Sequence, residues 1–332
     1  MLYFALVYDT FVSPLAPGPA EGDCRMQFVT DLAQRLQRRR AGLHVARAFP
    51  PSDGVEHLFV DAGGVQLHVA CAGPADGPVI VLLHGWPEHW WLWREVIPAL
   101  AHHGMRVLAP DLRGFGWSEA TRGGYDKEQL ASDVLALMDA MGIESFDLVG
   151  HDWGGWIAQL VALRSPQRVR HLALLNIAPV WQTAGGALRH LHRLAYQPMV
   201  GAPVLGPMLH RSSVLWWAVG RMGMPPVAVA EFRQGFRERG RAVAGSKVYR
   251  TFVSREVPAI LRGRYEGQRL TVPTRVLFGL DDPAIVRAML DDFARHADDL
   301  VITDVPECSH FIVDERPARV VQWLQQTLTV TT

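Results

Sequence analysis

The chain has few cysteines and almost no lysine. Its three cysteines, Cys24, Cys71 and Cys308, show no CxxC or paired spacing, so neither a disulfide framework nor a zinc site is expected. Only Lys127 and Lys247 are lysines, and the other 31 of the 33 basic residues are arginine. We interpret this bias as the codon usage of a GC-rich bacterial genome. Unpaired, reduced cysteines favour a cytoplasmic location.

The chain also lacks net charge and a long apolar run. Its 33 basic residues are balanced by 33 acidic ones, which gives no electrostatic reason to expect nucleic acid or an anionic membrane as a partner. The apolar stretch 2–12 is interrupted by Asp9, has no basic residues before it and is too short to span a bilayer. We expect neither a signal peptide nor an anchor. We interpret residues 1–50 as an N-terminal extension. A translation start assigned too far upstream would explain the presence of residues 1–25.

The remaining composition is that of an ordinary globular chain. With 332 residues, of which 49% are hydrophobic and 20% charged, the chain is long enough for one large core and an inserted subdomain. Strands are expected at 56–60, 65–70, 79–83, 105–109, 146–149, 171–176, 274–278 and 300–305, with helices at 90–100, 127–141, 156–163 and 316–328. The first two strands form a hairpin. Strands that alternate with helices predict a doubly wound, mostly parallel sheet.

A short apolar strand, the sequence Gly-X-Asp-X-Gly and an apolar helix follow one another across Phe146–Leu163. That order predicts a strand-turn-helix whose apex residue, Asp152, is forced outward. Gly150 and Gly154 flank the apex because a side chain at either position would clash where the helix packs against the strand. Serine at such an apex needs a base before it can attack. A carboxylate is already anionic at neutral pH and can displace a leaving group from carbon directly.

A second glycine turn, His84-Gly85-Trp86-Pro87, follows the buried strand 79–83. Glycine allows close backbone approach and an X-Pro bond can be held cis, so this loop can aim a backbone N–H at a developing oxyanion. No Gly-x-Gly-x-x-Gly opens any expected helix, and a dinucleotide site is therefore not supported.

Three motifs together carry a resemblance to a known family. The segments 84–87 (HGWP), 111–118 (DLRGFGWS) and 150–155 (GHDWGG) occur in this order and at these intervals. They resemble the α/β-hydrolase fold in its epoxide hydrolase branch, whose near relatives are the haloalkane dehalogenases. The resemblance covers about residues 55–330.

This resemblance implies a set of site residues around the two glycine turns. Asp152 would be the nucleophile, and the backbone N–H groups of Trp86 and Trp153 would form the oxyanion hole. The side chains of Trp86, Trp153, His84 and Pro87 would line the substrate pocket. No metal or organic cofactor is implied.

The resemblance also implies an acid and a histidine after the last strands, in the chain order nucleophile, acid, histidine. Two features favour Asp282 as the acid: it lies three residues after Gly279, and a proline follows it. Asp281 stays open as the alternative acid. His310 is the expected base. Ser309 stands where this family usually has glycine.

Residues 178–265 differ in character from the two segments around them, 51–177 and 266–332, which are expected to form the hydrolase core. They are rich in Trp, Arg, Gly and Pro and lack the pattern of buried strands. An inserted helical cap is therefore expected over the carboxyl edge of the sheet, where open α/β folds bind ligands. Cap helices are expected at 189–196 and 226–240.

Two cap tyrosines, Tyr196 and Tyr249, lie in segments that resemble the lid-tyrosine segments of epoxide hydrolases. Two phenols that converge on one point can hold an epoxide oxygen and supply a proton as the ring opens. The expected function is hydrolysis of a small apolar epoxide to a vicinal diol. A haloalkane dehalogenase with the same triad is the alternative, and a non-catalytic binding protein of the same fold is disfavoured because all three triad positions are filled. The sequence leaves the oligomeric state open.

Overall fold

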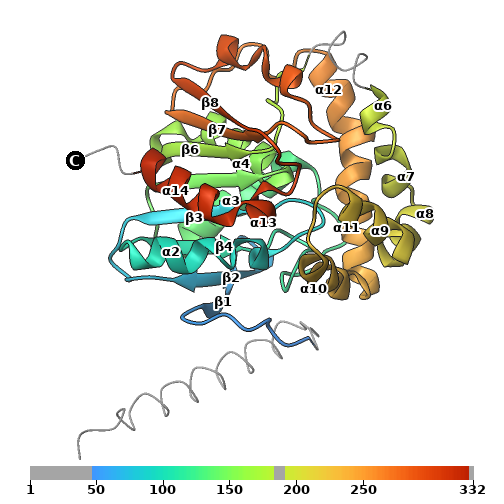
Figure 1. The fold of residues 1–332 in the computed structure, drawn as a ribbon, viewed down its shortest axis with the longest axis horizontal. Coiled ribbons are helices and arrows are strands. Elements are labelled where there is room, and N and C mark those ends of the chain that lie inside the picture. Colours follow the sequence, from blue (N-terminus) through green and yellow to red (C-terminus); the bar gives the residue numbers. More distant parts are fainter. Residues whose placement is uncertain (1–46, 183–190, 329–332) are drawn as a thin grey trace, which may run out of the picture. The chain divides into compact units, whose positions relative to one another are not determined.

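The computed structural model describes residues 47–182 and 191–328, and one eight-stranded sheet forms their centre (Figure 1). The strands are β1 (Glu56–Asp61), β2 (Gln66–Ala72), β3 (Val79–Leu83), β4 (Arg106–Pro110), β5 (Phe146–His151), β6 (Val169–Leu175), β7 (Thr274–Gly279) and β8 (Leu300–Val305). Their order in the sheet is β1-β2-β4-β3-β5-β6-β7-β8. The pairs β1–β2 and β2–β4 are antiparallel and the other pairs are parallel. The expected doubly wound, mostly parallel sheet is confirmed.

The pattern of apolar residues explains the position of each strand. The middle strands β3 and β5 are almost wholly buried, as continuous apolar runs require when helices cover both faces of a sheet. The expected hairpin between β1 and β2 is also confirmed, and its turn contains Gly63 and Gly64, both at positive φ.

Helices pack on the sheet in two pairs. Helix α2 (Val96–His102) contacts α14 (Pro317–Leu328), and α3 (Lys127–Ala140) contacts α4 (Trp153–Arg164). The expectation of one helix over 90–100 is wrong. The chain forms a 3-10 turn, η1 (Trp90–Trp93), and α2 starts afterwards, because the ring of Pro98 would collide with the carbonyl of residue 94 if one helix continued through both.

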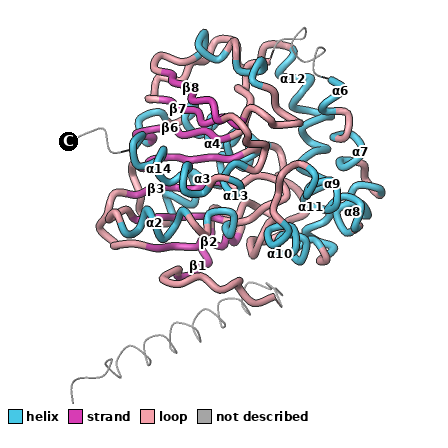
Figure 2. Tube along the Cα trace, in the orientation of Figure 1, coloured by secondary structure: helices cyan, strands magenta, loops and turns pink. Residues whose placement is uncertain are grey.

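The chain between β6 and β7 forms helices that lie together beside the sheet (Figure 2). They are α6 (Leu191–Leu194), α7 (Gln197–Gly201), α8 (Leu205–Arg211), α9 (Ser213–Arg221), α10 (Pro226–Phe236), α11 (Arg239–Thr251), the π-helical segment η3 (Phe252–Glu256) and α12 (Val257–Leu261). We call this group the cap. The helix expected at 189–196 falls partly outside the described residues. The one expected at 226–240 ends at Phe236, and α11 begins at Arg239.

The described helices include none with both the length and the apolar character that a bilayer crossing requires. The α13 turn (Ile312–Glu315) and the 3-10 turns η2 (Pro166–Arg168), η4 (Arg287–Leu290) and η5 (Phe293–His296) complete the described elements.

The turn between β5 and α4 places Asp152 at its apex, with φ +50°. A Cβ on Gly154 would overlap the backbone oxygens of Leu83 and His84, and one on Gly150 would overlap the backbone of Gly154. The first turn of α4 therefore rests directly on the backbone of β3 and β5. This close approach is what the two flanking glycines permit, as the sequence predicts.

The close approach gives a stability prediction. Gly154→Ala should lower the free energy of unfolding by about 3 kcal/mol or more, because the clash is with backbone and not with a side chain that can turn away. Gly123→Ala is the matched control, since nothing lies within 4 Å of a Cβ there, and it should change stability by no more than about 0.5 kcal/mol. Urea denaturation of both variants checks this. Equal effects at the two sites would contradict the packing argument.

Candidate active site

The carboxylate of Asp152 receives contacts from two loops. The backbone N–H of Trp86 donates to Asp152 Oδ1 at 2.8 Å, and His310 Nε2 lies 3.4 Å from Oδ2. The Trp86–Pro87 peptide bond is cis. Trp153 begins α4 directly after Asp152, so its N–H has no preceding helical carbonyl to accept it. Both backbone groups expected at an oxyanion hole thus lie beside the turn that carries Asp152.

His310 lies between two carboxylates. Its Nδ1 is 2.7 Å from Asp282 Oδ2, and its other nitrogen faces Asp152. Burial of the ring opposes the charged form, but the carboxylates of Asp282 and Asp152 outweigh burial and hold the pKa of His310 well above its usual value. The resting site therefore favours an imidazolium between two anions.

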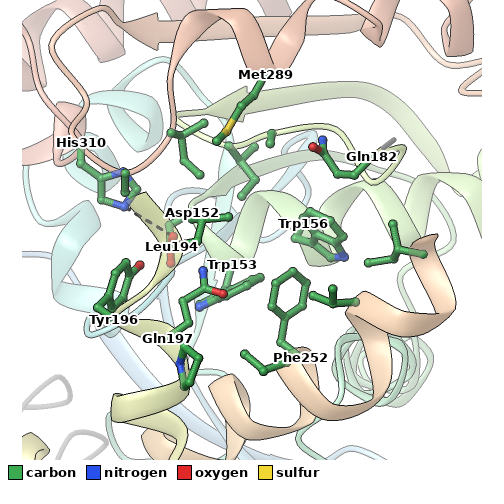
Figure 3. A pocket seen from close by; sticks show the side chains of 18 of the residues that line it. Asp152, Trp153, Trp156, Gln182, Leu194, Tyr196, Gln197, Phe252, Met289 and His310 are labelled. Atoms are coloured by element: carbon green, nitrogen blue, oxygen red, sulfur yellow. Dashed lines mark ion pairs between the residues drawn. The ribbon is translucent and has the colours of Figure 1, made fainter. Parts of the chain in front are cut away.

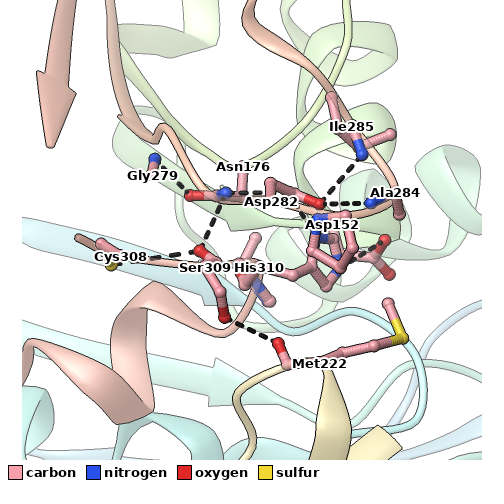
Figure 4. Close-up of polar contacts among 12 residues, drawn as sticks. Asp152, Asn176, Met222, Gly279, Asp282, Ala284, Ile285, Cys308, Ser309 and His310 are labelled. Atoms are coloured by element: carbon pink, nitrogen blue, oxygen red, sulfur yellow. Dashed lines mark hydrogen bonds and ion pairs between the residues drawn. The ribbon is translucent and has the colours of Figure 1, made fainter. Parts of the chain in front are cut away.

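Asp282 is fixed by backbone and side-chain donors (Figure 4). The N–H groups of Ala284 and Ile285 donate to its Oδ1 at 2.8 and 2.9 Å, and Asn176 Nδ2 donates to its Oδ2 at 2.9 Å. Burial raises the pKa of Asp282, yet His310 and these donors outweigh burial and lower it. Asp281, the alternative left open by the sequence, is exposed, and its N–H donates to the Cys308 carbonyl.

Asn176 is a residue that the sequence reasoning missed. It follows β6 at φ +42°. Its Oδ1 accepts from the Gly279 N–H at 3.1 Å, and its Nδ2 donates to Asp282 and to the Ser309 carbonyl. One side chain thus joins the loops that carry the acid and the histidine. Its place at the carboxyl end of a parallel strand was the available signal.

Ser309, which departs from glycine before the histidine, connects this loop to the cap. Its Oγ donates to the Met222 carbonyl at 2.6 Å and also contacts the Glu315 carboxylate. The Glu315 carboxylate in turn accepts the Ser309 backbone N–H at 3.0 Å. The loop that carries His310 is therefore bonded to the segment between α9 and α10 (Figure 4).

The two cap tyrosines meet each other near Asp152. The ring centroids of Tyr196 and Tyr249 are 5.8 Å apart, and the Tyr249 ring packs edge-on against Trp86 at 5.1 Å and Trp153 at 5.5 Å. Burial raises the pKa of Tyr196 to about 12 and that of Tyr249 well above its usual value. Both phenols are therefore neutral at neutral pH, and each can donate a hydrogen bond.

A cavity of about 190 Å³ opens in front of Asp152. Its polar lining side chains are Asp152, His310, Tyr196, Gln182 and Gln197, and the rest of the lining is largely apolar, including Trp153, Trp156, Phe252, Ile285 and Met289 (Figure 3). An apolar cavity with a few convergent polar groups is the usual form of a small-molecule site.

The predicted pocket lining needs correction. Trp153 lines the cavity, but His84, Trp86 and Pro87 do not. Both ring nitrogens of His84 bond to backbone groups, Nδ1 with the Gly85 carbonyl in its own loop at 2.8 Å and Nε2 as acceptor from the Leu112 N–H after β4 at 2.9 Å.

Trp86 directs its indole into the cap, where Nε1 donates to His210 Nε2 at 2.9 Å. Pro87 is buried beside this turn. The loop of residues 84–87 therefore contributes its backbone to the site and uses its side chains for support.

A buried ion pair lies behind the histidine loop. His151 Nδ1 is 3.0 Å from Glu88 Oε2, and its Nε2 is 2.8 Å from the His310 carbonyl. Both partners are acceptors, so a doubly protonated ring satisfies both. Burial opposes that form, but Glu88 outweighs burial and raises the pKa of His151. The pair holds the backbone on which the His310 ring is mounted.

The described ranges contain no group of three or more His, Cys, Asp or Glu side chains arranged to hold a metal ion. Tyr249 is buried against Tyr196, Trp86 and Trp153 and does not itself line the cavity.

Comparison with known proteins places this site in a family context. The alpha/beta hydrolase fold family matches residues 78–317. The AB hydrolase superfamily protein YfhM of Bacillus subtilis (strain 168) is 31% identical over 295 residues, which are 83% of this chain and 99% of that protein. A solved structure, the epoxide hydrolase CorEH without ligand, is 28% identical with a TM-score of 0.71, over 82% of this chain and 98% of that one.

Curated epoxide hydrolases match over shorter stretches. The soluble epoxide hydrolase of Corynebacterium sp. (strain C12) is 41% identical over 134 residues, which are 40% of this chain and 46% of that protein. The chain thus spans less than half the length of that relative at this identity.

The contact between Asp282 and His310 gives a prediction that needs no substrate. Asp282→Asn should lower the pKa of His310 by roughly one to three pH units, because it removes the anion beside Nδ1. Asp281→Asn is the matched control. It should leave the pKa of His310 within a few tenths of a pH unit of the wild-type value, since Asp281 lies in solvent. Imidazole proton shifts in an NMR titration, assigned with His310→Gln, measure both. An equal fall in the pKa of His310 in both variants would overturn the assignment of Asp282 as the acid.

Proposed function

Because the chain belongs to the α/β-hydrolase fold family, we propose that it is an epoxide hydrolase which converts an apolar epoxide to a vicinal diol through an ester on Asp152. The observation that carries the proposal is a pair of adjoining phenols near a carboxylate at the nucleophile position: Tyr196 lines the cavity with Asp152, and the Tyr249 ring centroid lies 5.8 Å from that of Tyr196. An epoxide oxygen stays attached to the substrate as the ring opens, and it needs a proton donor at that point.

In the first step Asp152 attacks one epoxide carbon and the bond from that carbon to the ring oxygen breaks. The alkoxide that forms takes a proton from one phenol while the other donates a hydrogen bond. A hydroxyalkyl ester of Asp152 results, and the deprotonated phenol recovers its proton from solvent. The apolar walls of the cavity support this step, because they keep water from competing with the carboxylate.

In the second step a water hydrolyses the ester. Esterification removes the charge of Asp152, one of the two anions that raise the pKa of His310, so the ring more readily gives up its proton and becomes a base. His310, oriented by Asp282, then takes a proton from water as the water attacks the ester carbonyl. The N–H groups of Trp86 and Trp153 hold the oxyanion, whose collapse releases the diol and restores the carboxylate.

A haloalkane dehalogenase is the second candidate, and one observation favours it. The indole Nε1 of Trp153 is buried and makes no hydrogen bond of ordinary geometry to the described residues, so it is a donor available to a leaving halide. The indole of Trp86, however, is already bonded to His210. The phenol of Tyr196 in the cavity wall, with the phenol of Tyr249 beside it, favours a substrate oxygen over a halide. A binding protein without activity is disfavoured because His310 contacts both Asp152 and Asp282.

The two-step mechanism predicts a trapped ester. His310→Gln should still react with a styrene-type epoxide but should not hydrolyse the product, since a carboxylate attacks without help from a base. Intact-protein mass spectrometry should show a gain of one substrate mass. Asp152→Ala should show none. If His310→Gln stays at its original mass while the wild type forms diol, His310 is not the water-activating base.

The phenols predict a rate effect confined to the first step. Tyr196→Phe and Tyr249→Phe should each slow ester formation by roughly ten- to a thousand-fold, as losses of general-acid or oxyanion donors do. The double variant should be nearly inactive. Single-turnover alkylation measures this, and hydrolysis of preformed ester should stay within a few-fold.

Tyr265→Phe is the matched control for loss of a phenol, because the Tyr265 hydroxyl is already used as a donor to the Glu128 carboxylate at 2.6 Å. It should alkylate at the wild-type rate. A double variant that opens epoxides as fast as the wild type would remove the main support for an epoxide substrate, and halide release from a haloalkane would then be the reaction to measure.

A further inference from the structure

Lys127 is one of only two lysines in the chain, and its side chain is completely buried. It is the first residue of α3, and the side chain extends from the core toward the cap. Lysine is among the residues least often buried completely, because its charge must be compensated. Lys247 gives a useful contrast, since it is only partly buried and donates to the Arg122 carbonyl at 2.7 Å.

Four groups surround the Lys127 ammonium, and all of them favour a positive charge. Nζ donates to the Val248 carbonyl at 2.7 Å and lies 3.3 Å from Glu256 Oε1. It also lies 4.3 Å from the ring centroid of Trp153 and 4.9 Å from that of Phe252. A carbonyl, a carboxylate and two π faces account for its donors. Burial lowers the pKa of Lys127, and Glu256 opposes that change.

The backbone of the cap is shaped for this contact. Val248, Phe252 and Glu256 are four residues apart, and in a regular α-helix each fourth residue lies about 40° further round the axis. The segment from Phe252 to Glu256 is instead π-helical, and its wider turn reverses that drift. The side chains of Phe252 and Glu256 and the backbone carbonyl of Val248 can therefore all reach the Lys127 ammonium. Such π-helical segments are rare and often occur at functional sites.

The groups that Lys127 holds adjoin the reacting groups. Val248 directly precedes Tyr249, and Trp153 directly follows Asp152. The rings of Tyr249 and Trp153 contact each other, and Trp153 and Phe252 form part of the cavity wall (Figure 3). One ammonium group thus joins the cap segment of the phenol to the core segment of the nucleophile.

We propose that Lys127 is a positioning residue, whose ammonium group fixes the cap segment carrying Tyr249 against the ring of Trp153. The fixed segment keeps the phenol directed at the epoxide oxygen while Asp152 attacks the carbon. Lys127 itself does not touch the substrate, because the two aromatic rings lie between it and the cavity. The inference rests on the proposed function and assigns to Lys127 control of the ring-opening step.

The first test compares the two lysines. Lys127→Met should slow single-turnover ester formation by roughly ten- to a hundred-fold, as small misplacements of reacting groups do. It should leave hydrolysis of preformed ester within a few-fold, because that step uses His310 and not the phenols. Lys247→Met is the matched control and should react at the wild-type rate. Lys127→Met with unchanged ester formation would overturn the proposal.

A second variant separates positioning from stability, because Lys127→Met leaves Glu256 buried without a counterion and should lower the Tm. In the double variant Lys127→Met/Glu256→Gln no unpaired charge remains, and glutamine keeps an acceptor for the Lys127 backbone N–H, which lies 3.2 Å from Glu256 Oε2. The Tm should recover while ester formation stays slow. If the rate recovers together with the Tm, Lys127 has only a structural role.

Hydrogen exchange tests the same contact without any substrate. In the double variant, peptides that cover 248–256 should exchange at least about tenfold faster than in the wild type, and α4 peptides should be unaffected. If the wild type opens no epoxide but this exchange difference is found, the proposed function fails and the anchoring role stands. If the wild type hydrolyses epoxides but the variants change neither hydrogen exchange nor the rate of ester formation, the inference about Lys127 is wrong and the proposed function stands.

Discussion

The contact on which this hydrolase depends is the packing of the first turn of α4 against the backbone of β3 and β5. Gly150 and Gly154 allow that distance, and the turn between them then has to take positive φ at Asp152. One constraint thus sets three things together: the outward direction of the carboxylate, the position of the Trp153 N–H at the helix start, and the placement of the Trp153 ring in the cavity wall. The backbone there is held in a conformation that its apex residue does not prefer, a kind of local strain that is common at functional sites.

Around that turn the charges are arranged in pairs that compensate burial. The Asp282 carboxylate faces the His310 ring. Behind the loop that carries His310, Glu88 faces His151. At the cap, Glu256 faces Lys127. None of these pairs is expected to add much net stability, since desolvation consumes most of the attraction. Their value lies in geometry, because each fixes a group whose direction matters and would be left with a buried, uncompensated charge if the partner moved.

The sequence predicted those parts of the molecule that depend on neighbours along the chain. Apolar runs predicted the strands, and the glycine spacing predicted the turn between strand and helix that has Asp152 at its apex. What it missed depends on residues that are distant in sequence: Asn176 contacts Asp282 because β6 ends beside the Asp282 loop, and Lys127 contacts Val248 because a cap helix lies close to the start of α3. The predicted pocket lining at Trp86 was wrong for a related reason. A motif shows that a loop is close to the site but not whether its side chains or its backbone face the substrate.

The hydrogen bond from Ser309 to the Met222 carbonyl bears on how such an enzyme can evolve. A helical insertion between two strands looks like a module that could be exchanged between relatives to change substrate range. Here the insertion is hydrogen-bonded to Ser309, the residue just before His310, so a foreign cap without a matching acceptor would lose that bond and leave Glu315 as the remaining partner of the hydroxyl. A cap exchanged into this chain is therefore expected to need a residue at position 309 that matches it.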